Sequence, residues 1–125
     1  MNVLVDSCGW IEYVVDGPLA GRFAPYIEDT AHVVVPTVVQ YEVFKWVCRE
    51  ANETLALEVI GRMGLGQVQP LDPSTALLAA HLSRHYRLAT ADAVIYAHAR
   101  ASRVPLLTSD AHFRDLPEVT LFIRG

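Results

Sequence analysis

The chain has 125 residues, of which 52% are hydrophobic, and a mean hydropathy of +0.25. This length corresponds to one domain, residues 1–125, that is large enough to bury a core. The formal net charge of −4 does not favour nucleic-acid binding on bulk charge alone. No apolar run reaches the roughly 20 residues of a membrane helix, and no signal-peptide pattern is present. We therefore expect a cytoplasmic protein without a membrane segment, in which Cys8 and Cys48 are reduced and half-buried.

Short apolar strands alternate with helical stretches along the chain. In chain order the pattern predicts a strand at 2–6, helices at 9–15 and 19–29, a strand at 32–36, helices at 37–51 and 53–64, an edge strand at 68–71, helices at 73–86 and 90–101, and strands at 104–108 and 119–123. Thr90 is the predicted N-cap of its helix. This alternation predicts a parallel sheet covered on both faces, with Val3, Leu4 and Val5 in its central strand.

Four acids are expected at one edge of this sheet. Asp6 ends the first strand and Asp110 follows the strand at 104–108, so both lie at the carboxyl edge. Glu42 and Asp92 lie near the starts of helices. These helices begin at the same edge, because a helix that leads into a parallel strand runs antiparallel to it. Open α/β sheets bind their ligands at this edge.

Each acid also has an ordinary structural explanation. Asp6 is a turn-forming residue, and Asp110 could cap the turn that follows it. Glu42 could form an ion pair with Lys45, and Asp92 could complement the helix dipole. Taken together, these explanations do not account for four acids that share one edge among apolar neighbours. Carboxylates that lie close together in a half-buried site repel one another, and a divalent cation relieves this repulsion.

The expected ligands favour a hard cation. Carboxylates, hydroxyls and water suit Mg²⁺ or Mn²⁺, and Ser7 and Ser109 are candidates to contact the metal shell or a substrate phosphate. A cation held by acids in an open cleft fits hydrolysis of phosphodiester bonds. His81 and His85 are four residues apart but lack the glutamate of the HExxH motif. For them we expect a partly buried or interface pair rather than a zinc site.

Four segments in order resemble the PIN-domain family, specifically its small VapC-like ribonuclease toxins of type II toxin–antitoxin systems. They are VLVDSCGWIEY, PTVVQYEV, LATADAVIYAHA and LLTSDAHF, and the resemblance spans essentially the whole chain. It implies a three-layer α/β/α sandwich with a mainly parallel central sheet. The family's four acids, which are its catalytic and metal-binding residues, match Asp6, Glu42, Asp92 and Asp110.

The resemblance also implies an activity and partners. These are Mg²⁺- or Mn²⁺-dependent cleavage of RNA, homodimerisation, and a small antitoxin protein that occludes the acidic cleft. The family's hydroxyls beside the first and last acids match Ser7 and Ser109. Cys8 and Gly9 are less typical of the family, and Asp115 is a spare acid for which a solvated turn is the simpler explanation.

Two functional hypotheses follow. The first is a metal-dependent endoribonuclease, a toxin or else a housekeeping nuclease. The alternative is a non-catalytic α/β protein whose acidic patch docks basic partners. A metal-dependent phosphatase of another α/β family is a weaker option, because the first strand ends in Asp6-Ser7-Cys8 and lacks a DxD motif.

Two further residue sets are candidates for binding surfaces. Aromatic residues that could form an interface, although core positions are more usual for them, are Trp10, Tyr13, Phe44 and Trp46. Arginines that could guide an RNA backbone, or simply form a solvated helix face, are Arg84, Arg87, Arg100 and Arg103.

Overall fold

Five short strands form one parallel sheet in the order β3-β2-β1-β4-β5. The structure is a computed structural model that describes residues 1–124. The strands are β1 (Val3–Val5), β2 (Val33–Pro36), β3 (Gln67–Gln69), β4 (Leu106–Thr108) and β5 (Val119–Leu121). β1 lies at the centre, as predicted, and β3 is an edge strand. Residues of β1, β2 and β4 are buried throughout, which explains their continuous apolar sequences.

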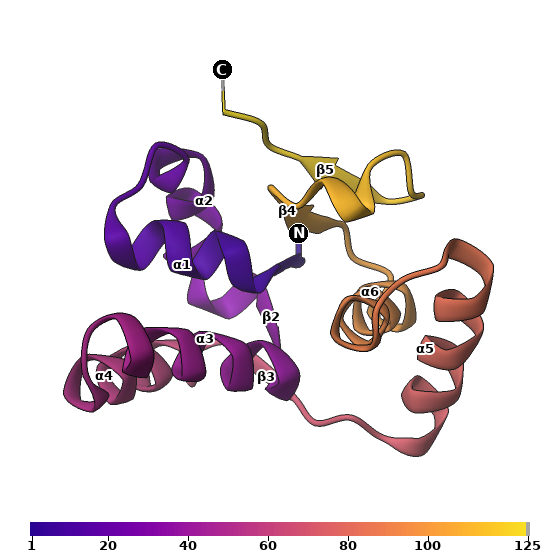
Figure 1. The fold of residues 1–125 in the computed structure, drawn as a ribbon, viewed down its shortest axis with the longest axis horizontal. Coiled ribbons are helices and arrows are strands. Elements are labelled where there is room, and N and C mark those ends of the chain that lie inside the picture. Colours follow the sequence, from indigo (N-terminus) through magenta and orange to yellow (C-terminus); the bar gives the residue numbers. More distant parts are fainter. Residues whose placement is uncertain (125) are drawn as a thin grey trace.

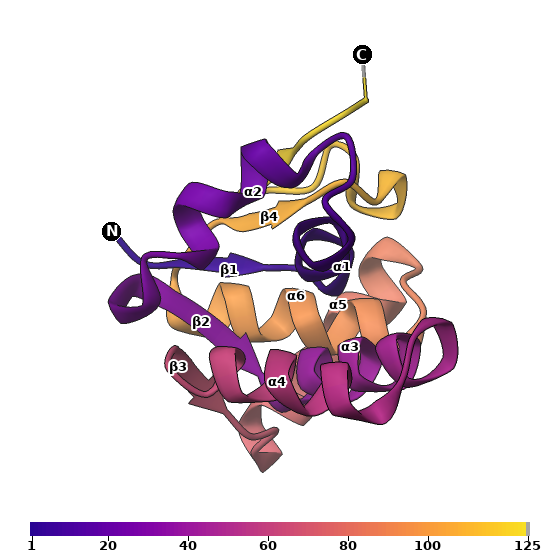
Figure 2. The same cartoon turned by 90° about the vertical axis from the view of Figure 1, so that its left-hand side faces the viewer.

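Six α-helices cover the sheet. They are α1 (Ser7–Val15), α2 (Ala20–Ile27), α3 (Thr37–Glu50), α4 (Glu53–Met63), α5 (Pro73–Tyr86) and α6 (Thr90–Ser102). Figure 1 shows α1 to α4 on one face of the sheet and α5 and α6 on the other, and Figure 2 shows the same layers from the side. The fold is therefore the three-layer α/β/α sandwich that the resemblance implied.

Helical periodicity accounts for the way α3 packs. Val39, Val43 and Val47 are spaced four residues apart, and each is at most 1% exposed. The opposite side of the helix carries polar and charged residues that face solvent. Because α3 follows β2 directly in the chain, the helix starts at the carboxyl edge of the sheet.

The structure differs from the sequence-based expectation at several boundaries. Ala89, not Thr90, occupies the N-cap position of α6, no side chain caps that helix end, and Thr90 is its first helical residue. The last strand ends at Leu121 rather than at residue 123, because the pairing with β4 ends there. Two short 3₁₀ turns also occur within residues 1–124. The first, η1 (Thr30–His32), was not predicted, whereas η2 (Ala111–Phe113) is the turn that Asp110 was expected to cap, and Asp110 is indeed its N-cap. Such single turns carry too few residues for a recognisable period.

The aromatic candidates are mainly core residues. Trp10 is 1% exposed, which excludes it from an interface, while Tyr13, Phe44 and Trp46 are half-buried and pack against the core. Both cysteines are free and half-buried, as expected. Among residues 1–124, no helix has the length and apolar character needed to cross a membrane.

Candidate metal centre

Asp6 is held rigidly where β1 passes into α1. It is the N-cap of α1, and its Oδ1 accepts a hydrogen bond from the Ser7 backbone N–H at 2.8 Å. Its Oδ2 accepts a second one from the Thr108 hydroxyl on β4, also at 2.8 Å. The residue is only 3% exposed. The carboxylate is therefore fixed by the central strand and its neighbour, and it is more than a turn residue.

The surroundings of Asp6 raise its pKa from 3.8 to about 6. Burial is the main cause, because it disfavours the charged form. The hydrogen bonds from Thr108 and Ser7 lower the pKa and offset part of this effect, and the charges of Asp92 and Glu42 raise it further. These last contributions indicate that three of the four predicted acids share one electrostatic environment.

Glu42 joins this site through Ser7. The Ser7 hydroxyl donates to Glu42 Oε1 at 2.9 Å, which connects the start of α1 to the second turn of α3. The ion pair with Lys45 that the helical spacing allowed does not form. Instead, the Lys45 ammonium lies 3.5 Å from the Tyr41 hydroxyl. Glu42 thus directs its carboxylate toward Ser7 and away from the cation on its own helix.

Asp92 and Asp110 meet at the same edge of the sheet. Asp92 lies in the first turn of α6, and Asp110 is the N-cap of η2, where its Oδ1 accepts the His112 backbone N–H at 2.9 Å. The backbone N–H of Asp110 donates to Thr108 Oγ1 at 2.9 Å. Burial, followed by the charge of Asp110, raises the pKa of Asp92, and the interaction with His112 opposes this rise.

His112 completes a group that has the dimensions of a metal site. Its Nδ1 lies 3.3 Å from Asp92 Oδ2 and 3.4 Å from Asp110 Oδ1. One ligand atom from each of these three residues lies within 4.8 Å of the other two. Two carboxylates and an imidazole are suitable donors for a divalent cation, and a cation would relieve the repulsion from Asp110 that, after burial, raises the pKa of Asp92. These residues therefore fit the cation that the resemblance implies.

Sequence reasoning missed His112. The only local signal is its position two residues after Asp110 in the segment LLTSDAHF. The sequence predicts a turn after Asp110, but it does not show that this turn, η2, folds the His112 imidazole back toward Asp92 and Asp110.

Cys8 and Ser109 form the remaining contacts beside Asp6. Cys8 Sγ accepts the Ser109 backbone N–H at 3.3 Å and lies 3.5 Å from Asp6 Oδ2. Burial raises the pKa of the Cys8 thiol to about 11, with the charge of Asp6 as the second cause. Of the two predicted auxiliary residues, Ser7 contacts Asp6 directly through its backbone N–H and reaches Glu42 with its hydroxyl, whereas Ser109 contacts Cys8.

Other candidates lie outside this centre. His81 and His85 are exposed rather than partly buried, so only the interface alternative remains for this pair, and neither belongs to a potential metal group within residues 1–124. Arg100 and Arg103 line a separate cavity of ≈ 410 Å³ at the C-terminal end of α6. Arg100 is eight residues along this helix from Asp92, roughly 12 Å at 1.5 Å per residue.

Comparisons with known proteins support the fold and the family. A model of the PIN domain family matches residues 3–119. A toxin–antitoxin complex from Klebsiella pneumoniae has a TM-score of 0.78 at 18% identity, over 95% of this chain and 96% of that one. VapC20 from Mycobacterium tuberculosis, a sarcin–ricin loop cleaving toxin, has a TM-score of 0.76 at 16% identity, over 94% and 97% of the two chains.

DNA-bound VapBC from Salmonella typhimurium is similar over 100% of this chain and 99% of that one, with a TM-score of 0.74 at 16% identity. At such identities the likeness concerns the fold. No match was found among curated protein sequences. The family model nevertheless covers nearly the whole described chain, including all four predicted acids. The chain belongs to the PIN domain family.

Proposed function

We propose that this protein is a metal-dependent endoribonuclease formed by one domain, residues 1–125. The observation that carries the proposal is the convergence of Asp6, Glu42, Asp92 and Asp110 at one sheet edge, where burial raises the pKa of Asp6 and Asp92. We assign these four acids as the catalytic and metal-binding residues, with Mg²⁺ or Mn²⁺ as the cofactor. Membership of the PIN family supports hydrolysis of RNA as the reaction.

The residues divide the chemistry between them. Asp92, Asp110 and His112, whose ligand atoms lie within 4.8 Å of one another, would hold the cation, with Asp6 and Glu42 completing the acidic shell around it. The bound cation would supply Lewis-acid stabilisation of charge that develops on the phosphoryl group. Asp6 and Glu42 orient and deprotonate the attacking water. A carboxyl group with a pKa of about 6 is suited to this role, since it is mostly ionised at neutral pH yet basic enough to accept a proton. Ser7 fixes the two carboxylates relative to each other, because its backbone N–H donates to Asp6 and its hydroxyl donates to Glu42.

We further propose that the protein is the toxin of a toxin–antitoxin pair. Two of the structures with a similar fold are a toxin–antitoxin complex and DNA-bound VapBC, and a third is a sarcin–ricin loop cleaving toxin. Under this proposal the partners are an RNA substrate, a small antitoxin and a second copy of this chain, and the protein acts in the cytoplasm. Co-expression with a small reading frame found next to the gene tests the antitoxin. Suppression of growth arrest and co-purification are the expected results.

The non-catalytic alternative is less consistent with the geometry. A patch that docks basic partners needs exposed acids, whereas Asp6 is 3% exposed and the Asp92 side chain 19%. A buried carboxylate can hold a cation or a water molecule, but it offers almost no surface to a protein.

RNA cleavage by the purified chain, with and without Mg²⁺ or Mn²⁺, tests the nuclease proposal. Asp6→Asn should abolish metal-dependent cleavage and retain the fold, because the substitution preserves shape. Asp16→Asn is the matched control: Asp16 is exposed at the other end of α1, in a left-handed conformation (φ 52°) that asparagine tolerates. Cleavage that survives in Asp6→Asn, or that needs no metal, would contradict the proposal.

A further inference from the structure

The exposed side of α3 beside Glu42 carries an aromatic ring followed by two cations. Tyr41, Lys45 and Arg49 are spaced four residues apart, so they lie along one side of the helix over two turns, roughly 12 Å. All three residues are exposed, and the Tyr41 side chain is 61% exposed.

This side of α3 is continuous with the candidate metal centre. The three residues line a groove of ≈ 250 Å³ whose other lining residues include Ser7 and Glu42. Because α3 begins at the carboxyl edge of the sheet, Tyr41 lies closest to the acids and Arg49 farthest from them. A chain that leads out of the metal centre along α3 therefore passes the aromatic ring first and the cations afterwards.

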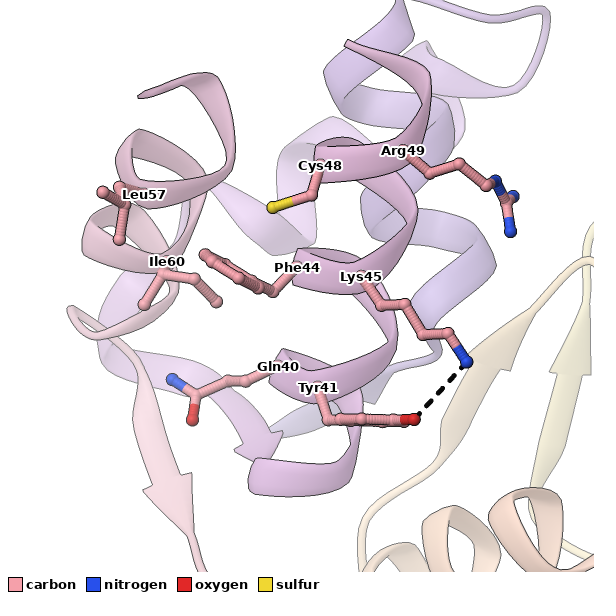
Figure 3. Close-up of a pocket in the computed structure, with 8 residues that line it drawn as sticks. All are labelled: Gln40, Tyr41, Phe44, Lys45, Cys48, Arg49, Leu57 and Ile60. Carbon is pink, nitrogen blue, oxygen red and sulfur yellow. Dashed lines mark hydrogen bonds between the residues drawn. The ribbon is translucent and has the colours of Figure 1, made fainter. Parts of the chain in front are cut away.

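The cations are available for a ligand. Lys45 forms no salt bridge among the described residues, and its ammonium lies 5.6 Å from the centre of the Tyr41 ring. Figure 3 shows Lys45 and Arg49 projecting from one side of α3, with Tyr41 beneath the lysine, whereas Phe44 and Cys48 project toward α4. Arg49 approaches the carboxylate of its neighbour Glu50 at 3.8 Å, but both side chains are more than half exposed and such a pair is weak.

An exposed aromatic ring with flanking cations is the combination that binds single-stranded nucleic acid. Bases stack on aromatic rings, and lysine and arginine contact the phosphates. We propose that Tyr41, Lys45 and Arg49 form a binding path for the single-stranded RNA that flanks the cleaved bond. Tyr41 stacks on a base next to the metal centre, and Lys45 and Arg49 contact phosphates farther along. This inference rests on the proposed nuclease function and assigns the positioning of its substrate.

Binding and cleavage are measured separately to test the path. Fluorescence anisotropy of a labelled single-stranded oligouridylate, with EDTA present to prevent cleavage, gives the affinity at several salt concentrations. Each of Lys45→Gln and Arg49→Gln should weaken binding and reduce the slope of log K against log salt by about 0.7. Tyr41→Leu should weaken binding roughly fivefold or more while leaving the slope unchanged. In cleavage assays with metal, all three variants should raise KM with little change in kcat.

Arg22→Gln is the matched control, because it removes the same charge from an exposed arginine on α2 that does not line this groove. It should leave affinity, slope and KM unchanged. Thermal unfolding of every variant checks that these exposed substitutions leave the fold intact.

The possible failures are distinguishable. If the wild-type protein cleaves RNA but Lys45→Gln and Arg49→Gln leave both KM and the salt slope unchanged, the path is wrong and the nuclease proposal stands. If the wild-type protein neither binds nor cleaves RNA, both proposals fail. If the two substitutions weaken binding of a labelled polyglutamate peptide but not of RNA, this side of α3 serves an acidic protein partner, and the RNA assignment is overturned.

Discussion

The hydroxyl of Thr108 donates a hydrogen bond to Asp6 Oδ2 over 2.8 Å, although the two residues are 102 positions apart in the sequence. Both residues are buried, and the same oxygen of Thr108 accepts the backbone N–H of Asp110. One hydroxyl on β4 therefore connects the acid at the end of β1 with the acid that follows β4. This connection makes the geometry of the candidate metal centre depend on the pairing of the two central strands.

Thr108→Val should destabilise the protein by about 1–3 kcal/mol, because it removes the hydroxyl donor of the buried Asp6 Oδ2 and leaves the Asp110 backbone N–H without an acceptor. It should also raise the pKa of Asp6 above its value of about 6, since the Thr108 hydrogen bond lowers that pKa. Urea unfolding measures the first effect and NMR titration the second. Thr108→Ser retains the hydroxyl and should keep the Asp6 pKa close to the wild-type value. Equal pKa values in the two variants would contradict this role.

The raised pKa of Asp6 predicts a specific pH dependence of stability in the metal-free protein. The pKa rises from 3.8 in the unfolded chain to about 6 in the folded one, so the folded state binds the proton more tightly. Protonation of Asp6 therefore stabilises the folded state. This contribution to the free energy of unfolding is complete below about pH 4 and is lost as the pH rises through about 6. The shift corresponds to about 3 kcal/mol.

Asp6→Asn removes this contribution, because asparagine does not ionise in this range. The free energy of unfolding of the wild type minus that of Asp6→Asn should therefore fall between about pH 4 and pH 6 and then become constant. Unfolding in urea over this pH range measures the difference. A difference that stays constant, or rises with pH, would show that the buried carboxyl is not destabilised when charged.

The loss of metal affinity on removal of the His112 side chain should depend on which cation is bound. Mn²⁺ and Mg²⁺ are both expected to raise Tm, since a cation relieves repulsion between Asp92 and Asp110. His112→Ala should weaken Mn²⁺ binding by roughly tenfold or more and Mg²⁺ binding less, because an imidazole nitrogen favours the transition metal. Isothermal titration calorimetry measures both affinities. His81→Ala is the control, because it removes an exposed imidazole outside the centre. Equal losses in the two histidine variants would argue against ligation by His112.

Gly9 is required by the close approach of α1 to the sheet. A Cβ atom at this position would lie 2.6 Å from Val5 Cγ1 and 2.7 Å from the Phe23 ring, both of which are buried. Gly9→Ala should therefore destabilise the protein by about 1–3 kcal/mol through overpacking, as measured by thermal or urea unfolding.

Gly21→Ala provides the comparison for Gly9→Ala. Gly21 also lies in a helix, but nothing comes within 4 Å of the corresponding Cβ position. Alanine is the better helix former by about 1 kcal/mol, so this variant should be as stable as the wild type or more stable. If Gly9→Ala were equally harmless, the packing of α1 on β1 would have to be looser than the structure shows.

Much of the fold could be predicted from local sequence patterns. Continuous β-branched runs such as VVV in β2 mark strands that are buried on both faces, and the valines of α3 repeat at the helical period. The alternation of the two kinds of element predicts a parallel sheet. In such a sheet, chain direction alone brings strand ends and helix starts to one edge. The common location of the four acids follows from this logic, without knowledge of any contact between them.

The contacts within the site depend on tertiary structure. The Ser7 bond to Glu42 joins residues 35 positions apart, and helical spacing instead suggested that Glu42 pairs with Lys45. Likewise, His112 reaches Asp92 only because η2 turns the chain back over the start of α6. Sequence patterns encode the period of an element and the face it buries, which are properties of neighbouring residues. The choice among polar partners depends on which side chains meet at the sheet edge, and only the packed structure decides that.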